Sequence, residues 1–166
     1  MTVESILRLA ELPRIAGLKD ASGDLSRTGE LRRQLGPDFL LLSGNDGETA
    51  AALALGSQGC ISVAANIAPA LCAALHRAWG SNDFSRFQYL RDLLDTLAAA
   101  LCVESNPIPA KWAMARLGLM EDEVRLPLTP LSQRHEETVR HALDAVLPFE
   151  AEEAARASAN HRHAAE

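Results

Sequence analysis

Lysine is almost absent from this chain of 166 residues. Among its 16 basic residues only Lys19 and Lys111 are lysines, and all the others are arginines. The net charge is −6, with acidic and basic residues interspersed, so the chain has no basic stripe for nucleic acid and no polybasic patch for a membrane. No apolar run approaches the roughly 18 residues of a membrane span, and Glu4 and Arg8 do not fit a signal peptide. We therefore expect a soluble, cytoplasmic protein without nucleic-acid or membrane partners.

Cofactor and metal motifs are missing as well. Cys60, Cys72 and Cys102 have no CxxC spacing and lie in apolar segments, which is typical of reduced, buried thiols rather than disulfides or zinc ligands. The glycine-containing turns match neither GxGxxG nor the P-loop pattern, so nucleotide binding has little support. His161 and His163 could bind a metal, but their composition favours a solvated tail. We expect no cofactor and no bound metal.

The stretch from Ile15 to Asp24 contains the most informative local pattern of the sequence. An apolar run ends at Lys19 and a small polar turn with a glycine follows, which predicts a buried strand, a turn and the start of a helix. Ligands of α/β proteins collect outside the carboxyl ends of the strands. A lysine there can form a Schiff base once it is neutral, which burial would favour and which arginine cannot do. The alternative is a solvated charge paired with Asp20 or Asp24.

Strands and helices alternate in the first part of the sequence. Apolar strands are predicted at residues 15–19, 39–42 and 59–63, and helices at residues 2–12, 24–36 and 49–55. Repeats of this kind indicate an α/β fold with a parallel sheet, either an open doubly wound sheet or part of a (β/α)8 barrel.

From Asn66 onward the pattern changes to helices alone. Helices are predicted at residues 69–80, 81–103, 107–117 and 132–146, some of them with proline at the start or glycine at the end. The segment from Glu150 has no apolar periodicity, so we expect a frayed helix or disorder there.

Four motifs follow one another in a recognisable order. They are GLKDASGD at residues 17–24, LSGND at 42–46, GCISVAAN at 59–66 and ESNPIPAKW at 104–112. Together they resemble the dihydrodipicolinate synthase family, which belongs to the pyruvate-dependent class I aldolase and N-acetylneuraminate lyase superfamily. The resemblance runs from about Val3 to Leu147.

This resemblance implies an α/β fold that is a partial TIM (β/α)8 barrel, made of the last three strands and followed by a C-terminal helical region. The implied organisation is a partial barrel over residues 1–67, a helical region over residues 68–149 and a flexible tail over residues 150–166.

The resemblance also implies roles for individual residues. Lys19 matches the lysine that forms a Schiff base with pyruvate, Gly44 matches a position that lines the substrate pocket, and Ile61 matches one whose backbone faces the lysine. Lys111 matches a structural segment and is interpreted as a helix-start charge. The implied reaction is the condensation of pyruvate with aspartate semialdehyde in lysine and diaminopimelate biosynthesis.

The family's Thr-Thr loop, its proton-relaying tyrosine and its carboxylate-binding arginine have no counterpart here, because they belong to earlier strands. Tyr89 is the only tyrosine, and we interpret it as a packing residue of a helix. Three strands cannot close a barrel, so apolar side chains that would face its interior lack partners. We place in this group Ile15, Leu18, Leu40, Leu42, Ile61 and Val63. We therefore expect a homo-oligomer or association with a complementary barrel half.

The leading hypothesis is a lyase polypeptide that acts on pyruvate and an aldehyde and is complete only when the missing half is supplied. One alternative is another pyruvate aldolase of the superfamily, such as a sugar-acid lyase. A different alternative is a non-catalytic fragment or subunit.

Overall fold

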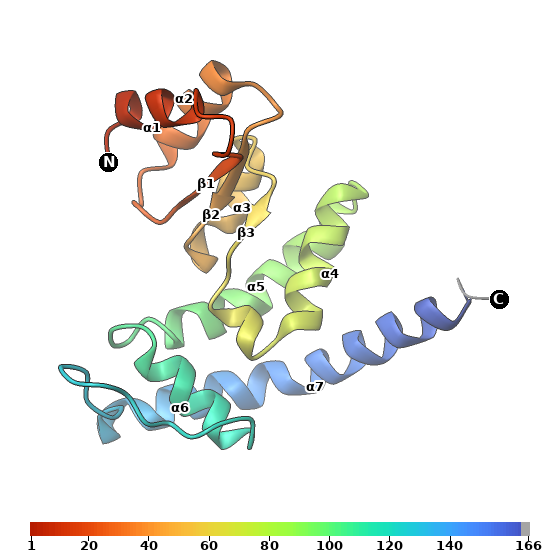
Figure 1. The fold of residues 1–166 in the computed structure, drawn as a ribbon. Coiled ribbons are helices and arrows are strands. Elements are labelled where there is room, and N and C mark those ends of the chain that lie inside the picture. The colour runs from red at the N-terminus through yellow and green to blue at the C-terminus, as the bar shows by residue number, and fades with distance from the viewer. Residues whose placement is uncertain (164–166) are drawn as a thin grey trace. The chain divides into compact units, whose positions relative to one another are not determined.

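The computed structural model describes the backbone of residues 1–163 and the side chains of residues 1–159. The chain forms two compact units, Met1–Ser62 and Val63–Glu166. The first unit contains every strand of the described chain, and the second is helical (Figure 1). Within the described residues, no helix combines the length and the apolar character needed to cross a membrane.

The first unit is built on a three-stranded parallel sheet. Its strands are β1 (Gly17–Asp20), β2 (Leu40–Ser43) and β3 (Gly59–Cys60), in the order β1-β2-β3. Lys19 pairs with Leu42, and Leu42 in turn pairs with Gly59. The sheet confirms the expected parallel α/β arrangement, although β3 is shorter than the predicted strand.

Helices of the first unit alternate with these strands. They are α1 (Val3–Ala10), α2 (Leu25–Leu35), the short 3-10 helix η1 (Asp46–Glu48) and α3 (Thr49–Ala54). Asp24 caps α2 by accepting a hydrogen bond from the Ser26 N–H, and Gly36 ends the same helix with φ of 71°. The predicted helices of this region are confirmed within a few residues.

The helices bury one face of the sheet and leave the other face open. Leu41 is 3% exposed and packs with Ile6, Leu31 and Phe39, whereas its neighbour Leu40 is 45% exposed. Successive side chains of a strand point to opposite faces, so burial of Leu41 under the helices turns Leu40 to the open side. This open face carries apolar side chains that have no cover within the first unit.

The expectation that Leu18 belongs to this open face is wrong. Leu18 packs against the core cluster under the helices. Lys19, the next residue, is exposed. Adjacent strand residues point to opposite faces, so Leu18 cannot lie on the same face as Lys19.

Arg32 forms hydrogen bonds with the two loops that precede β2 and β3. Its guanidinium donates to the carbonyl oxygens of Gly36, Phe39 and Gly56, the last at 2.9 Å from Nε. It also donates to the side chain of Gln58. Hydrogen bonds from a charged donor contribute more than neutral ones because the donor carries a full charge.

Replacing Arg32 with methionine should therefore lower the stability of the first unit by about 2–4 kcal/mol, since several carbonyl groups lose a charged donor. Urea denaturation followed by circular dichroism would measure the change. Arg33→Met is the matched control, because Arg33 is an exposed neighbour on the same helix. Equal unfolding midpoints for the two variants would contradict the assigned role of Arg32.

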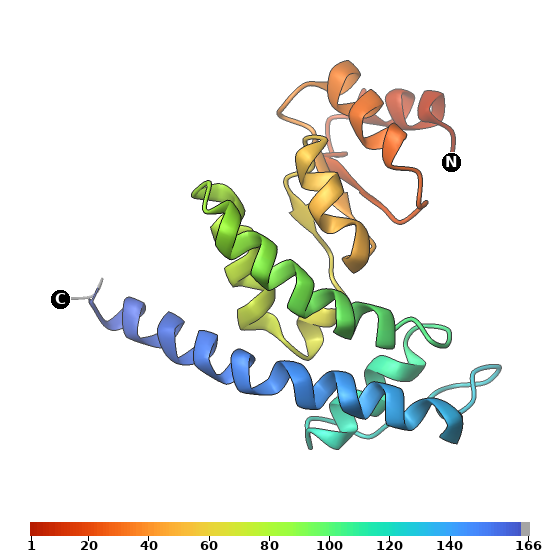
Figure 2. The same ribbon diagram turned by 180° about the vertical axis from the view of Figure 1, so that it is seen from behind.

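The second unit contains four longer helices and one short turn of 3-10 helix. These are η2 (Ala64–Asn66), α4 (Pro69–Gly80), α5 (Phe84–Ala100), α6 (Ile108–Arg116) and α7 (Gln133–His163). Helices α4, α5 and α7 pack against one another, and α6 packs against α7 (Figure 2). Their fully buried side chains include Leu71, Leu90, Leu97, Leu101, Val139 and Val146.

Helix α7 runs past Val146, where the sequence predicted its end, and includes Pro148 and the segment from Glu150 onward. The reason lies in two long-range contacts. Glu150 accepts hydrogen bonds from the N–H groups of Ala70 and Leu71, at 3.0 and 2.9 Å, and so caps α4. Glu153 is 6% exposed and forms ion pairs with Arg86 and Arg156.

Flexibility of the tail remains a prediction, and the side chains of His161 and His163 lie outside those described.

Glu150→Ala should destabilise the second unit by about 1–2 kcal/mol, because it removes the acceptor for two amide groups at a helix start that has no side-chain cap of its own. Thermal unfolding would report the loss. Glu152→Ala serves as control, since Glu152 is exposed on the same turn of α7. A loss of equal size in both variants would show that the capping contact contributes nothing.

Candidate active site

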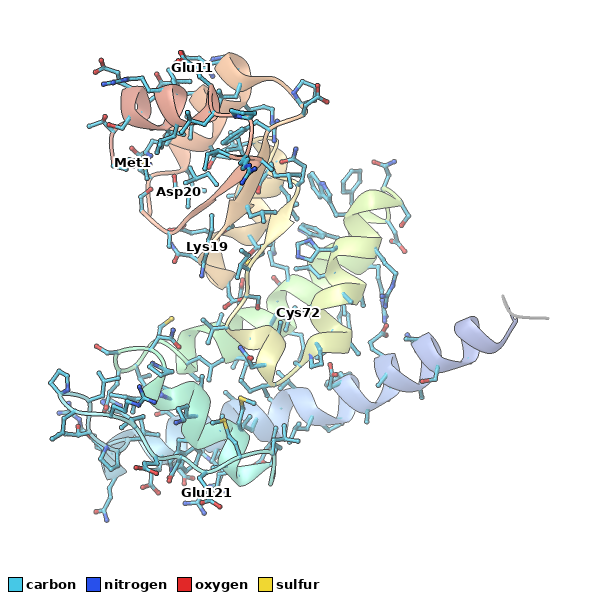
Figure 3. All side chains as sticks on the ribbon, viewed as in Figure 1. Met1, Glu11, Lys19, Asp20, Cys72 and Glu121 are labelled. Atoms are coloured by element: carbon cyan, nitrogen blue, oxygen red, sulfur yellow. The ribbon has the colours of Figure 1, made fainter. Side chains whose placement is uncertain are left out.

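Lys19 lies in β1 one residue before the carboxyl end of the strand, and its side chain is exposed (Figure 3). The Leu18 side chain packs against the core under the helices. Successive side chains of a strand point to opposite faces, so Lys19 points to the open face of the sheet. The sequence predicted this position at the strand end. Burial of the amine, which would favour its neutral form, is not found in this chain.

Neither of the two carboxylates considered as partners for Lys19 forms an ion pair with it in the described residues. Asp20 instead faces Arg27 of α2, with 3.3 Å between Oδ2 and Nε, and accepts a hydrogen bond from the Ser22 N–H. Asp24 caps α2, and its bond to Ser26 lowers the pKa of its carboxyl group. The description of Lys19 as a strand-end charge paired with Asp20 or Asp24 is therefore not supported by these contacts.

Gly44 lies directly against Lys19. Its N–H donates to the Asp20 carbonyl at 2.7 Å, which continues the hydrogen bonding between β1 and β2. A Cβ atom at Gly44 would come within 2.9 Å of Lys19 Cε and 2.7 Å of Ala21 Cβ, both closer than side-chain carbons tolerate. The absence of a side chain at Gly44 thus makes room for the lysine stem.

Ile61 follows β3 directly and shares the open face of the sheet. Its N–H donates to the Ser43 carbonyl at 2.8 Å, so its backbone is held beside the end of β2. Its side chain is 48% exposed. Lys19, Gly44 and Ile61 come from three successive parallel strands and the turns that follow them, so the three residues singled out from the sequence lie along one edge of the sheet.

Two further groups near this edge were not selected from the sequence. Burial raises the pKa of the Cys60 thiol, with Asp46 adding to the increase, while Lys19 acts in the opposite direction. The carboxylate of Asp46 accepts a hydrogen bond from the Ser62 hydroxyl. The only sequence signal that could have selected Asp46 is its position two residues after Gly44 in the same turn. Cys60 is half-buried, as is Cys72, whereas Cys102 is exposed and does not fit the expectation of a buried thiol.

Lys111 and Tyr89 both belong to the helical unit. The Lys111 amine donates to the backbone carbonyl of Glu123 and so holds the segment that follows α6. Tyr89 contacts Phe149 with ring centroids 6.2 Å apart, and the Arg86 guanidinium lies 5.8 Å from its ring centre. These contacts agree with the structural interpretation of both residues.

The chemistry available at the sheet edge is that of a primary amine beside a glycine. A neutral amine can attack a carbonyl carbon, and the space at Gly44 leaves its stem unobstructed. Among the described side chains, no group of three His, Cys, Asp or Glu residues is arranged to hold a metal ion. Covalent chemistry at Lys19 stays a prediction.

Comparison with known proteins agrees with the fold. The model of the dihydrodipicolinate synthetase family matches residues 1–146. The 4-hydroxy-tetrahydrodipicolinate synthase of Rhodospirillum centenum is 48% identical over 143 residues, which are 86% of this chain and 49% of that protein. The enzyme of the same name from Pseudomonas aeruginosa is 43% identical over 143 residues, again 86% of this chain and 49% of the relative.

Solved structures give the same result. The 4-hydroxy-tetrahydrodipicolinate synthase of Methylacidiphilum fumariolicum superimposes with a TM-score of 0.83 at 34% identity, over 93% of this chain and 51% of that one. The dihydrodipicolinate synthase of Aquifex aeolicus gives 0.82 at 38% identity, over 86% and 49%. The chain thus spans about half the length of the relatives that it matches.

Proposed function

The chain belongs to the dihydrodipicolinate synthetase family, and on this premise we propose that it is a cytoplasmic, pyruvate-dependent lyase polypeptide of the 4-hydroxy-tetrahydrodipicolinate synthase type. Its curated relatives carry that name. The observation that supports the proposal most directly is Lys19 at the end of β1, with Gly44 leaving room for its stem. Condensation of pyruvate with aspartate semialdehyde is the reaction we infer for the complete enzyme.

Imine formation begins at the Lys19 amine. The neutral amine of Lys19 attacks the keto carbon of pyruvate, a proton moves from nitrogen to oxygen, and the resulting carbinolamine loses water to leave the imine. The imine then withdraws electrons from the adjacent methyl group, which can lose a proton and attack an aldehyde carbon. That second step requires oriented acid and base groups. We infer that they are contributed by residues outside this chain.

Cover for the open face of the sheet is the second requirement. Lys19 is exposed, and Leu40 and Ile61 on the same face are 45% and 48% exposed. A barrel of this kind closes with eight strands, and the described chain has three. We propose that a polypeptide carrying the other βα units covers this face, or that copies of the chain associate through it. Either would exclude water from Lys19 and favour its neutral amine.

A second candidate function is that of a non-catalytic subunit or fragment. The observation in its favour is again the exposure of Lys19, because a solvated amine is mostly protonated at neutral pH. Size-exclusion chromatography of the purified chain distinguishes a subunit from a fragment. A discrete folded oligomer favours a subunit, whereas elution as an aggregate favours a fragment.

Trapping of the imine tests the proposed function. The purified chain is incubated with pyruvate and borohydride, and the intact mass and a peptide map are recorded. We expect a single pyruvyl adduct at Lys19, with Lys111 as the internal reference because no other lysine is present. Equal labelling of Lys19 and Lys111, or no adduct in a folded sample, would contradict catalytic competence of this chain.

A further inference from the structure

A side-chain hydrogen bond joins the turns that follow β2 and β3. The Ser62 hydroxyl donates to Oδ1 of Asp46, the first residue of η1, and both side chains are half-buried. Strand β3 ends at Cys60, and the Ile61 N–H forms a further bond with the Ser43 carbonyl at 2.8 Å. The bond between Asp46 and Ser62 therefore continues the link between the two strands beyond their paired residues.

The turn that contains Asp46 also lies against Lys19. Gly44 precedes Asp46 by two residues, and a Cβ atom at Gly44 would come within 2.9 Å of Lys19 Cε. The backbone of the turn is thus in close contact with the lysine stem. A small shift of the turn would change the space in which the amine and a bound carbonyl compound must fit.

Other hydrogen bonds of this turn fix its internal shape. The hydroxyl groups of Ser43 and Thr49 donate to the Asn45 carbonyl, at 2.9 and 3.2 Å. The side-chain amide of Asn45 donates to Glu48 at 2.9 Å. These partners all belong to one short segment. The bond from Ser62, in contrast, reaches across 16 positions of the sequence, so it relates the turn to the neighbouring strand.

We propose that the hydrogen bond between Asp46 and Ser62 is a positioning contact for Lys19, which holds the Gly44 turn where it leaves room for the lysine stem and its pyruvate adduct. The inference rests on the proposed function, because it concerns imine formation at the same lysine. Lys19 remains the nucleophile, and the two positioning residues act on it through the backbone of the turn. Reaction rates fall steeply when a reacting group is misplaced, so a contact outside the chemistry can control them.

The experiment breaks the hydrogen bond from each side and then restores it. Ser62→Ala removes the donor and Asp46→Ala the acceptor, whereas Ser62→Thr keeps a hydroxyl and Asp46→Asn keeps an acceptor oxygen without the charge. Trapping at Lys19 with pyruvate and borohydride is measured in the full chain by intact mass and peptide mapping. Each alanine variant should slow trapping by about three- to tenfold, as expected for the loss of one hydrogen bond. The two conservative variants should trap at nearly the original rate, and the double alanine variant should be no slower than either single one.

A second readout reports on Lys19 without pyruvate. With carbon-13 at the lysine ε position, the chain gives two lysine resonances, and Lys111→Arg assigns them. Cε of Lys19 is the atom closest to the missing Gly44 side chain among those of the lysine, so its resonance responds to the position of the turn. It should move in Ser62→Ala and return in Ser62→Thr, while the Lys111 resonance stays constant. A contact that only stabilised the fold would leave the Lys19 resonance and the trapping rate of the folded chain unchanged.

Ser5→Ala is the matched control, because it also removes a serine hydroxyl that bonds to a side chain, in this case Thr2 Oγ1 at 3.0 Å. It should change neither readout. Equal trapping in Ser62→Ala and the original chain would overturn the inference, and so would equal slowing by Asp46→Asn and Asp46→Ala, which would assign the effect to charge. If the Lys19 resonance responds as expected but no variant traps pyruvate, the proposed function fails and the inference stands. If all variants trap equally at Lys19, the inference fails and the proposed function stands.

Discussion

Replacing Lys19 with arginine should abolish imine trapping by this chain, a loss of at least about a hundredfold, because the guanidinium stays protonated and cannot act as a nucleophile. The fold should be preserved, since the Lys19 side chain is exposed and arginine keeps the positive charge. Intact-mass analysis after incubation with pyruvate and borohydride measures the loss, and far-ultraviolet circular dichroism checks the helix content.

Lys111→Arg is the matched control for this substitution. It changes the only other lysine in the same way, and the Lys111 amine bonds to a carbonyl in the helical unit, a contact that arginine can also form. This variant should trap pyruvate as well as the unchanged chain. Persistent trapping in Lys19→Arg would assign the adduct to another amine and contradict the proposed site.

The local pattern around Lys19 was sufficient to predict where the residue lies. An apolar run, a lysine and a glycine-containing turn specify a strand and its end, and these signals depend only on neighbours in the sequence. Asp24 and Asp83 accept backbone hydrogen bonds at the starts of α2 and α5, and aspartate just before a helical segment is a local signal of the same kind. Short-range rules therefore account for most of the element order.

Contacts between distant residues were not predictable in this way. Arg32 reaches Gly56 and Gln58, which lie 24 and 26 positions away, and nothing in its own segment marks it among the arginines. Glu150 reaches α4 across 80 positions of the sequence. The pattern of its own segment is polar, and polar periodicity alone indicates frayed structure. Only the folded helical unit shows why α7 continues beyond Val146.

The exposure of Lys19 also depends on more than its local sequence. Desolvation of a barrel lysine depends on the strands that close the barrel, and the described part of this chain forms a sheet of three strands. The same geometry explains why Leu40 and Ile61 are exposed although both lie in apolar segments. Composition reports how apolar a strand is, but the number of layers that cover it depends on the whole assembly.

Gly44→Ala should reduce imine trapping at Lys19 by tenfold or more, because the added methyl group would lie 2.9 Å from Lys19 Cε and 2.7 Å from Ala21 Cβ. The lysine stem can swing aside, but Ala21 Cβ is fixed to the backbone, so the end of β1 must also move. Misplacing a reacting group by about 1 Å can cost two orders of magnitude in rate. Forcing an extra carbon into such a contact typically costs about 1–3 kcal/mol of stability as well.

Two further variants make this prediction specific. Gly47→Ala adds the same methyl group to the same turn, where a Cβ meets nothing within 4 Å, and should leave trapping and stability unchanged. Ala21→Gly combined with Gly44→Ala removes the closer of the two clashes and should restore part of the trapping rate. Trapping is followed by intact mass and stability by thermal unfolding. Equal behaviour of Gly44→Ala and Gly47→Ala would mean that the space beside Lys19 has no role in its reactivity.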